Sequence, residues 1–283
     1  MITAMALFVV NDALVKLATT AYPTSQVLAV RGVFASSVAL ALVFAFRQSD
    51  SLGLLLRPQV TVRALMEGVV AFTFITALAF LQLANITAIL QSSSLIIIVL
   101  AAFLGIERMD WKRWLAVAIG FAGVLLIVRP RADGFNVYSL LALVSAAMVA
   151  IRDLMTRRIA VEIPTAVVAL GTTLGVTLLG VVIGFGEIWR PLAWRETLYL
   201  VLAAIVVSIG NTCIIIAYRN GEISTISSLR YTVLVFALVG GFLVLGEWPD
   251  ALALIGASLI VGSGLYALRR QRLGTQAAGS AVT

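Results

Sequence analysis

Two acidic residues in apolar stretches are each followed, four positions later, by a basic residue. Asp12, which follows Asn11, precedes Lys16, and Asp153 precedes Arg157. Residues four apart lie on one face of a helix, so each acid can pair with its base. Charges inside apolar surroundings need a partner or water, because burying an isolated charge is costly. We interpret these residues as two structural ion pairs or, alternatively, as a polar wall that would meet a zwitterionic small molecule.

We also expect mainly structural roles for the other charged residues in or beside apolar stretches. Arg31 belongs to the same polar wall or ion-pair set, and we expect it to hydrogen-bond to backbone carbonyls or to Asp12. Glu67 is predicted to lie near the start of its helix. Glu107 and Glu247 each closely follow a Leu-Gly pair at the end of an apolar stretch. That repetition predicts a capping role for both glutamates and no contact with a substrate.

The residue types that are missing argue against catalysis. The chain contains no histidine, which excludes a Ser–His pair and a histidine-based zinc site. Its single cysteine, Cys213, lies in an apolar run and has no histidine to activate its thiol. We therefore expect no enzyme, no cofactor and no metal site.

The overall composition indicates the class of protein in which these charged residues lie. Hydrophobic residues make up 61% of the chain and charged residues 12%, whereas a soluble domain carries roughly 25% charged residues. The mean hydropathy is +1.09, an excess that a lipid bilayer can accommodate and a single globular core cannot. The net charge of +7 does not indicate nucleic-acid binding, because the basic residues are dispersed at the ends of apolar stretches.

The apolar stretches have the length of membrane-spanning helices, which need about 20 mostly apolar residues. We predict an all-α integral membrane protein with ten transmembrane helices joined by short connections. The predicted spans are 2–20, 25–46, 63–83, 87–105, 112–129, 137–157, 164–186, 197–217, 224–246 and 250–268.

The two halves of the chain repeat one pattern. Asp12, Lys16 and Pro23 correspond to Asp153, Arg157 and Pro164 at one constant offset, and the Leu-Gly pairs before Glu107 and Glu247 have nearly the same offset. We predict a first five-helix repeat at 1–131, a second at 132–268 and a disordered cytoplasmic tail at 269–283. Because five crossings is an odd number, the second repeat is inverted, an arrangement typical of transporters.

The distribution of Lys and Arg predicts the orientation. Most of the 20 basic residues lie in one set of connections, and cytoplasmic loops carry the excess of Lys and Arg. We therefore predict a multi-pass protein of the cell inner (plasma) membrane with both termini cytoplasmic. The connections expected to face outwards are 21–24, 84–86, 130–136, 187–196 and 247–249.

Several of these sequences resemble a known family. The spacing of Lys16, Pro23 and Arg31 is similar to the opening of EamA-type members of the drug/metabolite transporter superfamily. The closing segment is more specific. It contains Arg230-Tyr231-Thr232, then Gly246-Glu247-Trp248-Pro249-Asp250, then Gly256-Ala257-Ser258-Leu259-Ile260-Val261-Gly262-Ser263-Gly264-Leu265-Tyr266.

The resemblance implies ten helices, a central cavity and transport of small organic metabolites. The family includes YddG-like amino-acid exporters and importers of S-adenosylmethionine or riboflavin. One departure concerns the fourth span, where many relatives have a proline and this chain has Ser92-Ser93-Ser94. The sequence therefore does not itself predict a kink there.

A set of apolar and hydrogen-bonding residues lies in spans that, by this resemblance, line the cavity. Such a mixture is typical of small-molecule pockets, although the same side chains also form hydrogen bonds between helices. The predicted substrate-binding residues are Phe72, Phe74, Gln91, Ser94, Ser208, Asn211, Thr212, Ser228, Arg230 and Tyr231. Pairs of glycines, such as Gly171 with Gly175 and Gly180 with Gly184, predict close helix packing.

The functional prediction is a transporter of small organic metabolites that works by alternating access through a central cavity. Export of amino acids is favoured by the resemblance, and import of S-adenosylmethionine, riboflavin or another metabolite is the alternative. A passive channel would need a polar lining or a filter, and the sequence shows neither. The expected partners are a small-molecule substrate and the lipid bilayer, with no nucleic acid, and the expected state is a monomer or weak homodimer.

Overall fold

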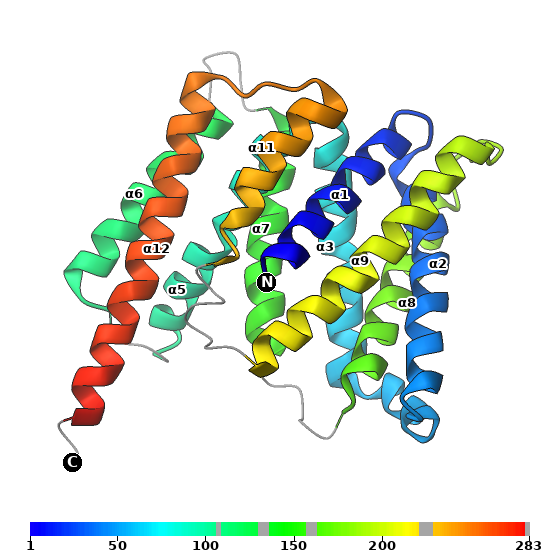
Figure 1. The fold of residues 1–283 in the computed structure, drawn as a ribbon, viewed down its shortest axis with the longest axis horizontal. Coiled ribbons are helices and arrows are strands. Elements are labelled where there is room, and N and C mark those ends of the chain that lie inside the picture. The colour runs from blue at the N-terminus through cyan, green and yellow to red at the C-terminus, as the bar shows by residue number, and fades with distance from the viewer. Residues whose placement is uncertain (106–108, 130–135, 157–162, 221–228, 281–283) are drawn as a thin grey trace.

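A computed structural model describes residues 1–105, 109–129, 136–156, 163–220 and 229–280. Every regular element in these ranges is a helix (Figure 1). The elements are α1 (Ile2–Thr19), α2 (Thr24–Ala45), η1 (Ser49–Leu56), α3 (Pro58–Phe80), α4 (Leu83–Gln91), α5 (Ser93–Phe103), α6 (Trp111–Val128), α7 (Val137–Thr156), α8 (Thr165–Gly184), α9 (Trp194–Asn220), α11 (Thr232–Leu245) and α12 (Ala251–Ser280).

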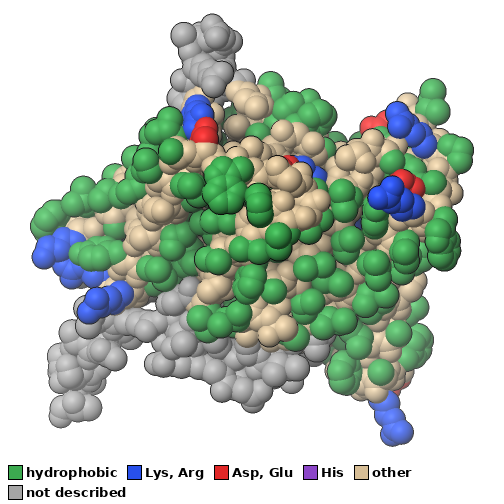
Figure 2. All heavy atoms as spheres, turned by 45° about the horizontal axis from the view of Figure 1, so that its top comes forward, with side chains coloured by type: hydrophobic (Ala, Val, Ile, Leu, Met, Phe, Trp, Pro, Cys, Tyr) green, Lys and Arg blue, Asp and Glu red, His purple; other side chains and the backbone are tan. Residues whose placement is uncertain are grey.

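Much of this helical structure has the length and composition of membrane spans. Within the described ranges, 8 helices are long and apolar enough to cross a bilayer, with Leu83–Phe103 treated as one, and α11 is a shorter apolar helix. Hydrophobic side chains are spread over the face seen in Figure 2, and most charged side chains visible there lie toward its margins. The molecule is therefore an all-helical protein suited to a membrane, whereas the count of ten spans and the inverted repeat stay predictions.

The helices run between two ends of the bundle (Figure 1). We call the end that carries the α1–α2, α3–α4, α8–α9 and α11–α12 connections the upper end, and the end that carries η1 the lower end. α1 packs against α9 and α11, α2 against α8 and α9, and α3 against α7 and α8. The largest hydrophobic core lies among these helices together with α4, α6 and α12, and includes Leu28, Leu78, Ile86 and Leu200.

α6 and α12 form an antiparallel pair at one side of the bundle (Figure 1). A Cβ atom added to Gly123 would lie 2.6 Å from the Gly256 carbonyl oxygen, and one on Gly256 would lie 2.5 Å from the Gly123 oxygen. The backbones therefore touch where both residues lack a side chain, as small-residue packing requires. Gly262, further along α12, has no such contact, because an added Cβ there would meet nothing within 4 Å.

Each helix of this pair is also bound to the other at its ends. Asp110 caps α6 and forms an ion pair with Arg270 of α12 at 3.1 Å. Asp250 accepts a hydrogen bond from the Ala253 N–H at the start of α12 and pairs with Arg129, the residue after α6. This reciprocal arrangement is what an inverted repeat would produce.

The structure differs from the predicted spans in several places: besides the start of α4 at Leu83, which puts the connection predicted at 84–86 inside a helix, three differences stand out. α3 begins at Pro58, before the predicted start at 63, because proline is well tolerated in a first helical turn. α12 continues past the predicted end at 268, so the tail expected to be disordered is helical as far as Ser280. Extending an existing helix is much easier than nucleating a new one.

The third difference is an interruption in the predicted fourth span. α4 ends at Gln91 and α5 begins at Ser93. The Ser92 hydroxyl donates to the Ile89 carbonyl oxygen at 2.6 Å, and the Ser92 N–H donates to the same oxygen at 3.0 Å. A serine that hydrogen-bonds back to the preceding turn can bend a helix without proline.

Candidate functional site

Lys16 forms an ion pair with a residue far away in sequence. Its ammonium group donates to a carboxylate oxygen of Glu247 and to the Leu81 carbonyl oxygen. The other Glu247 oxygen accepts the Leu83 N–H at 2.7 Å, so this carboxylate caps the first turn of α4. The Lys16 and Glu247 side chains are only 12% and 19% exposed. The upper ends of α1, α3, α4 and α11 are therefore held at one polar junction.

This junction corrects the predicted Asp12–Lys16 pair. Lys16 lies close to the upper end of α1, where the α11–α12 connection supplies a nearer carboxylate than the one a turn below. The Asp12 carboxylate instead accepts a hydrogen bond from the Asn11 amide at 2.8 Å. The capping role predicted for Glu247 is present, while Glu107 lies outside the described residues.

Asp12 has a different basic neighbour, Arg31 of α2. The Asp12 carboxylate and the Arg31 guanidinium interact electrostatically, and Arg31 interacts in the same way with Glu67 of α3. Among the described residues, however, Arg31 makes no direct hydrogen bond or ion-pair contact through its side chain, and its Nε is buried without a partner. The expectation that Arg31 would bond to carbonyls or directly to Asp12 was therefore wrong.

A second charged cluster lies in the lower half of the bundle. Arg152 of α7 donates to Glu67 at 2.8 Å and to Asp153 at 2.7 Å. Arg63 of α3 donates to the Thr172 hydroxyl of α8. Glu67 is deeper than predicted because α3 starts earlier than expected, so it meets α7 instead of lying at the start of its helix.

Among the described residues, the basic partner of Asp153 is Arg152, whereas the predicted partner was Arg157. Arg157 lies outside the described residues. Asp153 accepts two hydrogen bonds from its sequence neighbour Arg152, at 3.0 Å and 2.7 Å.

The predicted pocket residues divide into several groups. Phe72 and Phe74 of α3 pack against the main hydrophobic core. Gln91 and Ser94 flank the interruption between α4 and α5, and both are partly buried. The interruption thus places two of the predicted hydrogen-bonding residues in the middle of the predicted fourth span.

Arg230 and Tyr231 form a turn immediately before α11. Tyr231 is 5% exposed, and its hydroxyl has no partner among the described residues that meets standard hydrogen-bond geometry. An added Cβ on Gly264 would collide with this hydroxyl, so Tyr231 packs directly against α12. Ser228 lies outside the described residues.

α9 carries the remaining predicted residues. Leu200 and Ala204 are fully buried, and Asn211 lies on the same helical face two turns further toward the lower end. Asn211 is nevertheless exposed, so the inward face of α9 becomes accessible at that level. Ser208 is half-buried and donates to the Ala204 carbonyl oxygen at 2.7 Å, while the Thr212 side chain is outside the described residues.

Sequence reasoning missed a set of contacts between the α1–α2 connection and the segment before α9. The Gln26 side chain donates to the Arg190 carbonyl oxygen at 2.7 Å and accepts the Arg190 N–H at 3.0 Å. The Ser25 hydroxyl donates to Glu187, and the Tyr22 hydroxyl accepts the Ala193 N–H at 2.6 Å. Ser25 and Gln26, polar residues at the start of an apolar stretch, were the available signal.

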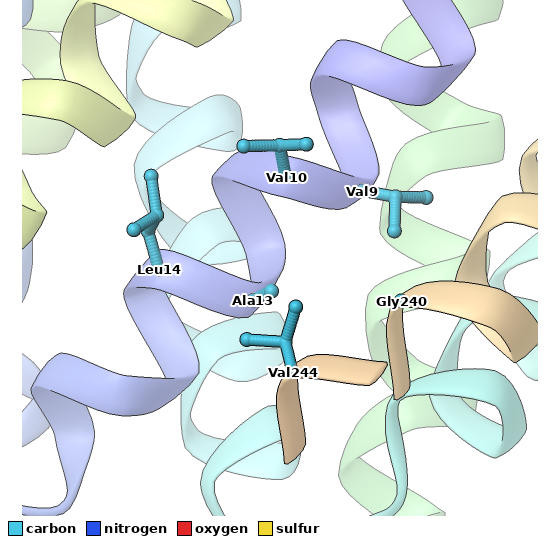
Figure 3. Close-up of a pocket in the computed structure, with 6 residues that line it drawn as sticks. All are labelled: Val9, Val10, Ala13, Leu14, Gly240 and Val244. Carbon is cyan, nitrogen blue, oxygen red and sulfur yellow. The ribbon is translucent and has the colours of Figure 1, made fainter. Parts of the chain in front are cut away.

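An apolar groove lies between α1 and α11. It is lined by Val9, Val10, Ala13, Leu14, Gly240 and Val244 (Figure 3). Val10 and Val244 are about half exposed, and none of the lining side chains is polar. A charged or strongly polar ligand would have no partner here, so the candidate site is the polar interior and not this groove. Among the described residues, no group of three or more His, Cys, Asp or Glu side chains could hold a metal ion.

Comparisons with known proteins agree with this architecture. The chain is 27% identical over 263 residues to the pseudopaline exporter CntI of Pseudomonas aeruginosa, covering 90% of this chain and 89% of that protein. It is 24% identical over 215 residues to an S-adenosylmethionine uptake transporter of Rickettsia bellii, covering 74% and 70% of the two chains. It is also 26% identical over 155 residues to a riboflavin transporter of Vibrio cholerae, covering 55% and 52%.

A protein of known crystal structure has a similar fold, with a TM-score of 0.66 and 25% sequence identity over 96% of this chain and 97% of the other. A sequence model described as the EamA-like transporter family matches residues 1–129 and 136–268. These relatives are transporters of small metabolites, and the apolar helices indicate a multi-pass membrane protein. The chain therefore belongs to the EamA-like transporter family.

Proposed function

We propose that this protein exports amino acids or similarly sized metabolites across the inner membrane by alternating access, with both termini in the cytoplasm. The main support is the contrast along α9, whose inward face is buried at Leu200 and Ala204 and exposed at Asn211. A bundle that is closed at one end and accessible at the other is one of the two states that alternating access requires.

The proposed substrate path starts at the accessible lower end and reaches the polar residues between the helices. Gln91, Ser94, Ser208 and Asn211 would offer hydrogen bonds along that path, and Phe72 and Phe74 would supply apolar surface. Thr212, Ser228, Arg230 and Tyr231 complete the proposed lining. Pockets for small molecules usually combine such groups.

Import of S-adenosylmethionine, riboflavin or another metabolite is the alternative. Relatives with these activities align with much of the chain, and the pseudopaline exporter aligns with more of it. Export is therefore favoured.

Transport by purified protein in proteoliposomes tests the proposal. Labelled amino acids, S-adenosylmethionine and riboflavin are offered separately, with and without a pH gradient. Saturable movement of any of them that depends on the protein supports transport of small metabolites. If correctly folded protein moves none of them, the proposed function is wrong. Acceleration by an imposed gradient would indicate proton coupling, and its absence would indicate facilitated diffusion.

Two substitutions test the proposed lining. A hydrogen bond worth about 1 kcal/mol corresponds to a roughly fivefold change in affinity. We therefore expect Asn211→Ala and Gln91→Ala each to raise the half-saturating substrate concentration by roughly fivefold, with unchanged expression and thermal unfolding. Wild-type kinetics in both variants would remove these two residues from the site.

A further inference from the structure

Asp12 and Arg31 are opposite charges at the same depth of the bundle. Asp12 is seven residues below the last residue of α1, and Arg31 is seven residues below the first residue of α2. At 1.5 Å per residue, both lie about 10 Å from the upper ends of their helices. They interact electrostatically, but neither makes a direct ion-pair contact with the other.

The neighbouring charges are already paired. Lys16, one turn above Asp12, is bound to Glu247, and Glu67, the second acidic group near Arg31, is bound to Arg152 at 2.8 Å. Among the described residues, the side-chain donor to Asp12 is the amide of Asn11. Of these charged residues, Asp12 and Arg31 are the two without a described partner of opposite sign in direct contact, and they are also the two that interact with each other at longer range.

Arg31 itself and Asn11, the residue bound to Asp12, carry an unsatisfied donor and an unsatisfied acceptor. Within the described part of the chain, Arg31 Nε is buried without a hydrogen-bond partner, and so is Asn11 Oδ1, on a side chain that is only 4% exposed. Buried polar groups are normally hydrogen-bonded, and a buried charge without a direct partner is costly. A bound molecule that carries both a positive and a negative group would satisfy these requirements.

We infer that Asp12 and Arg31 form a binding site for an α-amino acid group, with Asp12 receiving the ammonium and Arg31 the carboxylate. Guanidinium groups bind carboxylates through two parallel hydrogen bonds, and a carboxylate readily accepts from an ammonium group. The inference rests on the proposed transport function and narrows it to free amino acids or metabolites that contain an amino acid group, such as S-adenosylmethionine. Riboflavin, which has neither group, would not use this site.

The test compares whole and incomplete zwitterions on the full-length protein in proteoliposomes. Labelled L-methionine, S-adenosylmethionine and riboflavin are the transported probes. The decarboxylated amine of methionine and its desamino acid are the unlabelled competitors. Each lacks one of the two charged groups, so we expect each to compete with methionine or S-adenosylmethionine at least roughly tenfold less well than whole methionine does. This comparison uses the wild-type protein and does not depend on the folding of a variant.

Two variants then assign each ligand group to its residue. In Arg31→Gln, the preference for methionine over the decarboxylated amine should fall to near unity, while the preference over the desamino acid remains. In Asp12→Asn, the pattern should be reversed. Arg63→Gln, which removes an arginine of the lower cluster, should keep both preferences. A loss of packing would change the affinity for all competitors together, so it would not produce this exchange.

The outcomes separate the inference from the proposed function. Movement of riboflavin without movement of either zwitterion would leave transport standing and overturn the inference. Movement of a zwitterion with equal competition by both incomplete analogues, or with both preferences unchanged in both variants, would also overturn it. If folded protein moves no probe, the proposed function falls and the inference falls with it. Selective loss of one preference in each variant supports the site.

Discussion

The upper and lower ends of the bundle differ in how far side chains bind the backbone. At the upper end, ion pairs such as Lys16–Glu247 are accompanied by bonds from side chains to distant backbone groups, as Gln26 makes with Arg190 and Glu247 with Leu83. At the lower end, the contacts described above join side chains to side chains, as in Arg152–Glu67 and Arg63–Thr172. Asn211 is exposed on the inward face of α9 toward that end.

This difference indicates which end resists opening. A bond from a side chain to a backbone group fixes the path of the chain, because backbone groups cannot turn away without moving the connection. A bond between two long side chains can break and re-form by rotamer changes alone. For a protein that we propose to open alternately at its two ends, the upper-end contacts are the ones that must break to expose the other side. The four predictions below are arranged from the largest expected effect to the smallest.

Glu247→Ala should have the largest effect. The substitution leaves Lys16 without its carboxylate and the Leu83 N–H without its acceptor. Removing one partner of a largely buried ion pair is strongly destabilising, and we expect a loss of about 3 kcal/mol in the free energy of unfolding, measured by thermal or denaturant unfolding in detergent.

The matched change at the lower end is Glu67→Ala. Arg152 keeps Asp153 as a partner, so this variant should lose about 1 kcal/mol. Glu247→Gln should be intermediate, because its amide oxygen can still accept from Leu83. A larger loss for Glu67→Ala than for Glu247→Ala would reverse the comparison of the two ends.

Glycine substitutions in α8 should give the second-largest difference between the two ends in the free energy of unfolding. A Cβ on Gly180, toward the upper end, would lie 2.7 Å from the Ala29 nitrogen and 2.9 Å from the Ser25 oxygen. Both are backbone atoms that can move only with α2. Overpacking of this kind costs about 1–3 kcal/mol, so Gly180→Ala should be destabilising by about 2 kcal/mol in the same unfolding assay.

Gly171→Ala is the lower-end counterpart. Its Cβ would meet the side chains of Val60 at 2.8 Å and Leu55 at 3.3 Å. Side chains can rotate, and alanine is favoured over glycine in a helix by about 1 kcal/mol. We expect a change of less than about 1 kcal/mol, and equal losses for the two variants would show that both ends pack with similar rigidity.

Gln26→Ala should have a smaller effect than either upper-end change above. Gln26 is 2% exposed and makes both of its hydrogen bonds to Arg190 backbone atoms. We expect a loss of about 1–2 kcal/mol in the free energy of unfolding, since two hydrogen bonds made by a buried side chain are lost. Gln82→Ala is the control, because Gln82 makes a long 3.4 Å bond to the Trp248 oxygen in an exposed position. If Gln82→Ala were as damaging as Gln26→Ala, burial would not explain the difference.

The smallest expected effect is on how the stability of the protein depends on pH. The hydrogen bond from Arg129, helped by the Ala253 N–H, lowers the pKa of Asp250 below its ordinary value. A carboxyl group whose pKa is lower in the folded state stabilises the protein above its unfolded pKa of about 4, and this contribution is lost as the pH falls through the folded value. Asp250 is 53% exposed, so the contribution is small. Asp250→Asn should flatten this part of the curve of unfolding temperature against pH; an unchanged slope would mean that other carboxyl groups cause it.

Much of the fold follows from local sequence. Five of the predicted spans coincide closely with α1, α2, α6, α7 and α8, because membrane helices need long apolar stretches. Pro23 and Pro164 directly precede α2 and α8, and Gly246 ends α11 with a φ of 65°, a backbone conformation that favours glycine. The interruption at Ser92 could not be predicted, since serine bends a helix only in some settings.

The sequence by itself determined that the chain is a helical membrane protein of the EamA type, and that charged residues lie inside it. Hydropathy, helix length and turn residues are local properties, so they can be read from neighbouring positions. The tertiary structure alone decided how those charges are paired. Lys16 and Glu247 are 231 positions apart in the sequence. Spacing within one helix had instead indicated Asp12, four positions away, as the partner of Lys16. Electrostatic partners are chosen by distance in space, which the packing of helices from both halves of the chain sets.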